Sequence, residues 1–245
     1  MRITDKYLDL LPCNLEGIPS FDLDMLGEEF EIYNSGIQDW SVYGPTKSLD
    51  NWKNPPFEYP NIHPIHKKLV DTVSDLHVNT VCDIGAGAGV MAKYVYNSNR
   101  DIDLTCVEGS DIHISQMKEN FDEENRVILP QIKVNANVIR GVAQEIPLPT
   151  NSQDLVYTCT VLMHIPYLMA IKAIEEISRV SHRYVLHLER KDGNVIMGKQ
   201  KSALNLLQID YQSVYSKLGF RTIKYEEFSY PEHEHLSCVY YLGEK

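Results

Sequence analysis

A run of alternating glycines constrains the fold of this chain more than any other feature. Residues 81–89 read Val-Cys-Asp-Ile-Gly-Ala-Gly-Ala-Gly, an apolar stretch with a carboxylate near its end and then a glycine-rich turn. Glycine has no Cβ and adopts positive φ at little cost, so such a turn lets the backbone approach a ligand closely. A helix is expected to follow over 90–97, with its N-terminal amides directed at the ligand. The pattern predicts a nucleoside-type ligand at the carboxyl end of a buried strand.

The spacing of the glycines indicates the class of ligand. A dinucleotide fingerprint reads Gly-x-Gly-x-x-Gly, but Val90 stands where its third glycine would be, and the glycines are Gly85, Gly87 and Gly89. Asp83 would repel a pyrophosphate, whereas it suits the ammonium group of a cofactor that carries an amino acid. The run therefore disfavours NAD and resembles motif I of the class I S-adenosylmethionine-dependent methyltransferases, Asp-x-Gly-x-Gly-x-Gly.

Three further segments follow in the order that this family shows. A second apolar strand ends in Glu108 and is followed by Gly109; a carboxylate at that point can accept hydrogen bonds from both ribose hydroxyls. The segments 138–147 and 154–165 resemble the third and fourth strands of the family. The resemblance extends from about Ile62 to the C-terminus. It implies S-adenosylmethionine (SAM) as the cofactor and S-adenosylhomocysteine (SAH) as its product.

The resemblance also implies a set of cofactor-binding residues. Asp83 and the glycine turn would hold the methionine end, and Glu108 the ribose. Val142 stands where the family often has the aspartate that binds the adenine amino group, so backbone groups near Ala143, with the side chain of Gln144, are expected to hold the adenine. The predicted cofactor-binding residues are Asp83, Gly85, Ala86, Gly87, Gly89, Glu108, Gly109, Ala143, Gln144 and Thr160.

Strand-like and helix-like segments alternate along 62–245 at the spacing of βαβ units. The sequence predicts an α/β fold: a Rossmann-like, seven-stranded, mostly parallel sheet with helices on both faces and an antiparallel C-terminal edge. A helix over 64–76 is expected to come first. The elements after it are expected at about 79–84, 90–98, 103–108, 111–120, 132–140, 154–161, 166–180, 183–189, 203–218, 220–228 and 236–243.

Residues 1–61 differ from this pattern, since they are rich in aromatic side chains and show only weak helical periodicity. We interpret them as a separate lid and substrate region in front of the SAM-binding domain, 62–245. In that interpretation Tyr33, Trp40 and Tyr43 line an apolar pocket for the acceptor. The alternative is that the region packs on the sheet as plain structure.

Composition narrows the function classes. A net charge of −11 disfavours a nucleic-acid partner, because a phosphate backbone is bound through clustered Lys and Arg. The five cysteines show no Cys-x-x-Cys spacing, so neither a disulfide framework nor a metal site is expected. The N-terminus lacks the apolar core of a signal peptide, and no segment has the length of a membrane span. A cytoplasmic protein without membrane contact is therefore expected.

Polar side chains near the strand ends suggest where chemistry takes place. His164 follows the fourth strand, and it is the candidate general base that takes a proton from the acceptor; the alternative is a structural histidine. His187 and Glu189 alternate on the fifth strand, so they lie on one side of the sheet. They are candidate substrate-binding residues, or else a hydrogen-bonded internal pair. The His-Glu-His tripeptide at 233–235 is read as a loop.

The sequence thus predicts a methyltransferase that acts on an oxygen or nitrogen atom of a small molecule, such as a natural product, a modified sugar or a small peptide. The alternatives are a protein or peptide methyltransferase, and a cofactor-binding regulatory subunit without catalytic activity.

Overall fold

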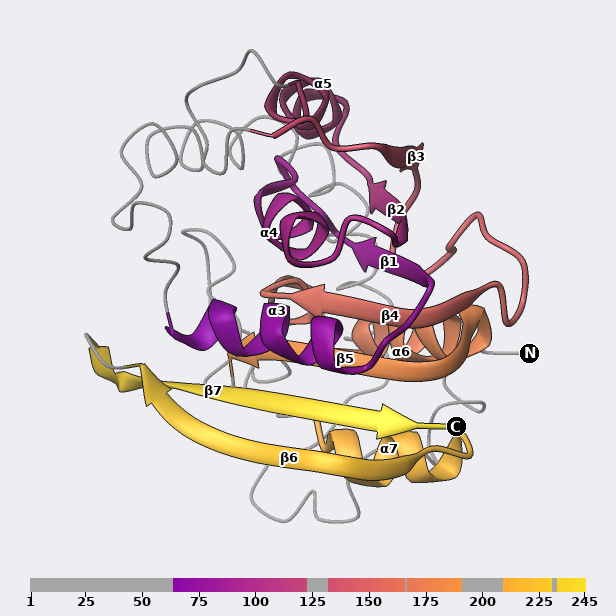
Figure 1. Cartoon of the computed structure of the whole chain (residues 1–245). Coiled ribbons are helices and arrows are strands. Elements are labelled where there is room, and N and C mark those ends of the chain that lie inside the picture. Colours follow the sequence, from indigo (N-terminus) through magenta and orange to yellow (C-terminus); the bar gives the residue numbers. More distant parts are fainter. Residues whose placement is uncertain (1–63, 123–131, 166, 191–208, 231–232) are drawn as a thin grey trace.

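The glycine turn follows the carboxyl end of an inner strand of a seven-stranded sheet (Figure 1). The computed structural model describes residues 64–122, 132–165, 167–190, 209–230 and 233–245. Its helices and strands are α3 Pro64–Asp75, β1 Thr80–Ile84, α4 Val90–Ser98, β2 Asp103–Glu108, α5 Asp111–Asn120, β3 Ala136–Arg140, β4 Gln153–Cys159, the 3₁₀ turn η2 Leu162–His164, α6 Tyr167–Val180, β5 Ser181–Arg190, α7 Tyr211–Lys217, β6 Arg221–Tyr230 and β7 His233–Glu244.

The strand order is β3-β2-β1-β4-β5-β7-β6. The first five strands are parallel, and β7 runs antiparallel to both β5 and β6. The chain builds outward from β1 to β3 and then returns to place β4 on the other side of β1. Ligands bind where the strand order reverses in this way, at the carboxyl ends of the strands. The predicted fold class is confirmed, including the antiparallel C-terminal edge.

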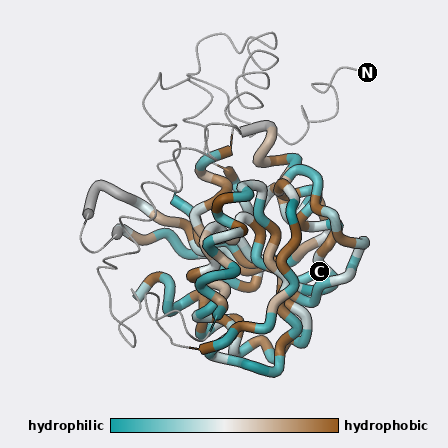
Figure 2. Tube along the Cα trace, turned by 90° about the horizontal axis from the view of Figure 1, so that it is seen from above, coloured by the Kyte–Doolittle hydropathy of each residue, from teal (hydrophilic) through white to brown (hydrophobic). Residues whose placement is uncertain are grey.

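Successive side chains of a strand point to opposite faces of the sheet, and those of the inner strands are apolar on both faces. Helices therefore cover both faces. Val81 packs with buried residues of α3, α4 and α5 on one face. Its neighbour Cys82 packs on the opposite face with α6 and α7. Hydrophobic stretches run along the central strands when the molecule is seen from above (Figure 2). The two cores together fix the carboxyl ends of β1, β2 and β4.

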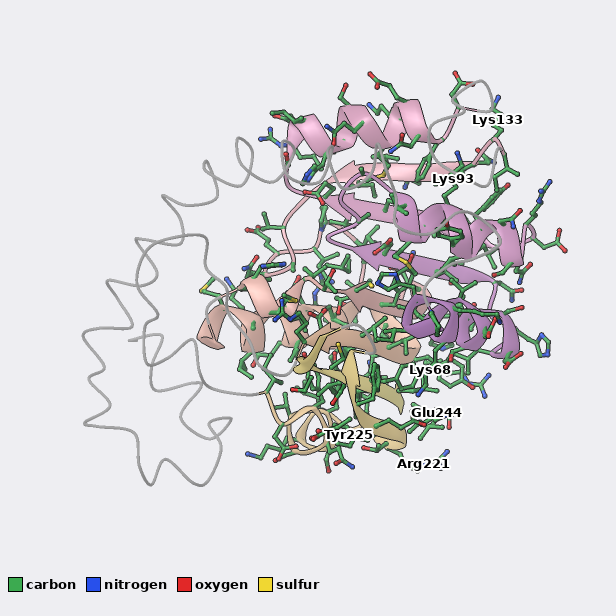
Figure 3. All side chains as sticks on the ribbon, turned by 90° about the vertical axis from the view of Figure 1, so that its left-hand side faces the viewer. Lys68, Lys93, Lys133, Arg221, Tyr225 and Glu244 are labelled. Atoms are coloured by element: carbon green, nitrogen blue, oxygen red, sulfur yellow. The ribbon has the colours of Figure 1, made fainter. Side chains whose placement is uncertain are left out.

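Helix α3 is attached to the antiparallel edge of the sheet. Lys68 pairs with Glu226 on β6 and lies 4.4 Å from the ring centre of Tyr240 on β7. Thr72 Oγ1 and the Tyr240 hydroxyl are 2.6 Å apart. Lys68 lies at the same end of the molecule as Arg221, the ion-pair partner of Glu244 on β7 (Figure 3). This attachment determines where the first turn of α3 lies.

The elements differ from the predictions at two places. Strand β3 begins at Ala136 rather than at 132, because the Val134 amide donates to the Phe121 carbonyl after α5 instead of to β2. The interpretation of 233–235 as a loop is wrong: Tyr230 pairs with His233, so the tripeptide already belongs to β7.

Other predictions fall outside the described ranges. Those for Tyr33, Trp40 and Tyr43 do so, as does the whole of 1–61. Within the expected helix 203–218, the structure describes residues from 209 onward, with α7 at Tyr211–Lys217. None of the helices in the described ranges is long and apolar enough to cross a membrane.

Candidate functional site

The three alternating glycines all adopt positive φ, at 70° for Gly85, 55° for Gly87 and 79° for Gly89. A Cβ on Gly85 would lie 2.7 Å from both methyl groups of Val161, and one on Gly89 would overlap the ring of Phe121. A Cβ on Gly87 would meet no atom within 4 Å. The outer two glycines thus allow close packing, and the middle one borders open space.

That open space is a pocket of about 340 Å³ at the carboxyl ends of β1, β2 and β4, a volume within the range of small-molecule sites. Nine of the predicted site residues line it, namely Gly85, Ala86, Gly87, Glu108, Gly109, Ala143, Gln144, Thr160 and His164. The pocket therefore brings most of the predicted cofactor site together. Asp83 and Gly89 are not part of its lining.

Glu108 is the charged group of this pocket. Its Oε2 accepts a hydrogen bond of 2.7 Å from the Gly87 amide, and its Oε1 one of 2.9 Å from the Ser110 amide. Burial raises the pKa of Glu108, but the His113 imidazole and these two amides lower it more, so the pKa lies below its usual value. An ionised carboxylate with further lone pairs can accept hydroxyl donors from a ligand.

Asp83 lies behind the pocket, inside the sheet. It is only 2% exposed, and its Oδ2 accepts a 2.8 Å hydrogen bond from the Tyr157 hydroxyl. Burial raises the pKa of Asp83 to about 8, and Glu108 contributes in the same direction against the Tyr157 hydrogen bond. The carboxyl is therefore largely protonated at neutral pH. That Asp83 contacts an ammonium group stays a prediction.

This burial has a measurable consequence for stability. Between about pH 4 and pH 8 the folded state binds one more proton at Asp83 than the unfolded state, so this group makes stability fall as pH rises. The Asp83→Asn variant removes the effect, on the order of 4 kcal/mol between pH 4 and pH 7. Urea unfolding at pH 5 and pH 7.5 is expected to show the variant gaining stability relative to wild type at the higher pH. If the free energies of unfolding of wild type and Asp83→Asn changed equally between pH 5 and pH 7.5, the buried neutral carboxyl group would be contradicted.

The loop after β3 forms another wall of the pocket. The Gly141 amide donates to the Glu108 carbonyl, and the Glu145 amide donates to the Val142 carbonyl. Ala143 and Gln144 are buried, and both line the pocket together with Val142. This wall has the apolar and amide character that the sequence predicts for holding a flat heterocycle.

Thr160 and His164, which follow β4, line a further side of the pocket. Thr160 has a φ of 57°, unusual for a β-branched residue, and its amide donates to the Leu188 carbonyl over 2.8 Å. His164 closes the 3₁₀ turn and lines the pocket. Burial, and after it the positive charge of Arg190, lowers the pKa of His164 to about 4, so the imidazole is neutral at pH 7.

His187 and Glu189 lie in the interior and are not part of the pocket lining. His187 Nδ1 is 2.7 Å from Thr158 Oγ1, and Nε2 is 2.6 Å from the Tyr215 hydroxyl. Thr158 also donates to Glu189 Oε1 over 2.7 Å. Burial lowers the pKa of His187 to about 3, so its ring is neutral. The two residues are an internal pair, and this geometry does not support the predicted contact with substrate.

Several polar or soft side chains in the lining were not predicted, among them two histidines and a methionine. His66 comes from the first turn of α3, Met91 from α4 and His113 from α5. A sequence signal exists for His113, which lies in the first turn of the helix after Glu108, on the same edge of the sheet. His66 gives none, because the long-range packing of α3 on α4 and the sheet brings it to the pocket.

Comparisons with known proteins agree with this geometry. Residues 81–183 match a family described as a methyltransferase domain. No curated protein matches the chain. Among solved structures, the magnesium protoporphyrin IX methyltransferase ChlM from Synechocystis PCC 6803 with bound SAH is similar over 86% of this chain and 99% of its own, at 13% identity and a TM-score of 0.63.

The same enzyme with bound SAM is similar at 15% identity and a TM-score of 0.60, over 85% of this chain and 96% of its own. The [4+2]-cyclase SpnF is also similar, at 15% identity and a TM-score of 0.61, over 85% of this chain and 94% of its own. The predicted cofactor and product are thus those with which ChlM was solved. The chain has the fold of the SAM-dependent methyltransferases, and the match to the methyltransferase domain family covers its central residues, 81–183.

Proposed function

We propose that this protein binds SAM and transfers its methyl group to an oxygen or nitrogen atom of a small molecule. The observation that carries the proposal is the Glu108 carboxylate, which is ionised, lies in the pocket and is held in place by the Gly87 and Ser110 amides. Ribose hydroxyls are the donors that such a carboxylate at the end of a second strand accepts. The position of Glu108 beside the glycine turn supports a nucleoside cofactor.

The residues of the pocket fit SAM in size and chemistry. The open space at Gly87 leaves room for the methionine part near the turn. Glu108 would hold the ribose, and the wall of Ala143 and Gln144 would hold the adenine. Thr160 and His164 would lie toward the reacting end. Adenine recognition would then rest on backbone groups and Gln144, since Val142 offers no side-chain acceptor.

Bound SAM would supply a methyl group on a positively charged sulfur. The chain would contribute mainly alignment of the acceptor with that methyl group, an effect that can supply up to about 7–11 kcal/mol of a barrier. His164 would take the proton of an acceptor hydroxyl or amine. Its Nδ1 is inaccessible to solvent, so Nε2 would be the nitrogen that receives the proton. A neutral imidazole at pH 7 has the protonation state that this role needs.

Fold alone does not establish methyl transfer, because the same architecture hosts different chemistries; the similar protein SpnF is a [4+2]-cyclase. The direct test is to incubate the purified protein with SAM labelled in its methyl group and with pooled small molecules that carry phenol, amine or sugar hydroxyl groups. We expect the label in a small-molecule product, and none with the Glu108→Ala variant. A parallel incubation contains added proteins instead of small molecules, and label in one of them would favour the protein methyltransferase alternative. No label in either incubation would favour a regulatory or cyclase role.

The base role of His164 predicts a specific kinetic effect. The His164→Gln variant keeps a polar atom near Nε2 but takes no proton, and kcat is expected to fall about a hundredfold, within the range for loss of a general base. SAH affinity should change by less than about threefold. Because the pKa of His164 is about 4, kcat/KM of the wild type should not fall below its plateau until the pH drops to about 5. A variant with full turnover and weaker SAH binding would instead make His164 a structural contact.

A further inference from the structure

The loop that carries His164 is attached to β5 through one buried carboxylate. Glu189 Oε1 accepts a hydrogen bond of 3.1 Å from the Val161 amide, and Oε2 accepts one of 3.3 Å from the Met163 amide. The side chain is only 1% exposed. Glu189 therefore lies beneath η2 and holds amides on either side of its first residue. One residue earlier, Thr160 is held by the Leu188 carbonyl.

The Glu189 side chain ends a series of buried hydrogen bonds that begins at Tyr215. The Thr158 hydroxyl donates its single proton to Glu189 Oε1, which also accepts from the Val161 amide. The Thr158 oxygen then accepts from His187 Nδ1–H. In a neutral imidazole this leaves Nε2 as the acceptor, and the Tyr215 hydroxyl donates to it. The series of hydrogen bonds runs from α7 through β5 and β4 to the loop that carries His164.

We propose that Glu189 is a positioning residue for His164, and that the Tyr215–His187–Thr158–Glu189 chain fixes the pocket loop 160–164. Three donors, namely the Thr158 hydroxyl and the Val161 and Met163 amides, fix the orientation of this carboxyl group more narrowly than one donor would. His187 and Glu189, which the sequence predicts to contact substrate, would thus act on the site through the loop 160–164. This inference rests on the proposed function only for the role of His164; the attachment of the loop is a property of the protein alone.

Hydrogen exchange of the ligand-free protein tests the attachment directly. In the Glu189→Gln variant, exchange in a peptide covering 160–164 should rise about tenfold, the change expected for losing one buried hydrogen bond. Peptides from β2 should stay unchanged. Thr158→Val, which breaks the chain in the middle, should give an intermediate rise, and Thr158→Ser, which keeps the hydroxyl, should restore protection.

Ser181→Ala is the matched control, because it removes a buried hydroxyl from the other end of β5, where Ser181 donates to the Tyr184 carbonyl. It should lower overall stability without selective exchange in the loop. A Glu189→Gln variant whose loop exchanges like wild type would overturn the proposal, as would a uniform rise over all peptides. SAH titration of the same samples separates the two proposals: wild type without SAH binding contradicts the proposed function, whereas loop protection is read without any ligand.

Discussion

Replacing Glu108 with alanine is expected to weaken SAH binding by about a hundredfold or more. The Glu108 carboxylate would accept hydrogen bonds from both ribose hydroxyls. Hydrogen bonds to a charged group contribute roughly 1.5–3 kcal/mol each. Its loss also frees the Gly87 and Ser110 amides, which Glu108 now holds, so the turn itself becomes less ordered. Isothermal titration calorimetry of the Glu108→Ala variant with SAH measures the effect.

Two companion variants make the result specific. Glu108→Gln keeps the shape but loses the charge, and its amide nitrogen cannot accept the second set of donors, so it should lie between alanine and wild type. Glu119→Ala removes an exposed carboxylate from α5 and should bind SAH like wild type. Equal affinity of Glu108→Ala and Glu119→Ala would show that Glu108 is not the ribose ligand.

The Gly89→Ala variant is expected to lose about 2–5 kcal/mol of stability. A left-handed conformation costs an L-residue about 1–2 kcal/mol, and overpacking a core typically costs about 1–3 kcal/mol more. At Gly89 both apply, since φ is 79° and the new Cβ would lie 2.6 Å from Met117 Cγ and from Phe121 Cε1. Thermal unfolding should show a drop in Tm of roughly 5–15 °C.

Gly219→Ala separates the two contributions. Gly219 has a φ of 87°, but a Cβ there would meet no atom within 4 Å, so only the conformational cost applies. The Tm of Gly219→Ala should fall by no more than about half of the drop expected for Gly89→Ala. If both variants lose the same stability, the close packing of the glycine turn against α5 contributes nothing.

The fold, and the gathering of most of the predicted cofactor residues around one pocket, were predictable because their signals are local. Alternating glycines permit the positive φ values that a tight turn needs, and an apolar strand that ends in Glu108 places a carboxylate at the sheet edge. Period-two alternation correctly placed His187 and Glu189 on one side of their strand. It could not tell that this side is closed, since the chain segments that cover them, α7 and η2, are distant in sequence.

Asp83 shows a similar limit. Its place before the glycines is a sequence property, but its burial depends on Tyr157 from the neighbouring strand β4. The pairing of β1 with β4 joins segments about 74 residues apart, and the sequence pattern predicts the pairing but not which side chain lies opposite which. His66 was missed for the same reason, because a long-range attachment of α3 brings it to the pocket.

The most direct test of the account is calorimetric titration of the wild-type protein with SAH and, separately, with NADH. The account predicts one site per chain for SAH, with a micromolar Kd or tighter, and no binding of NADH. The SAH expectation follows from Glu108, the proposed ribose ligand, and from the open space at Gly87. The NADH expectation follows from Val90, which stands where the dinucleotide spacing has its third glycine. A folded protein that binds NADH, or that binds neither ligand, would contradict it.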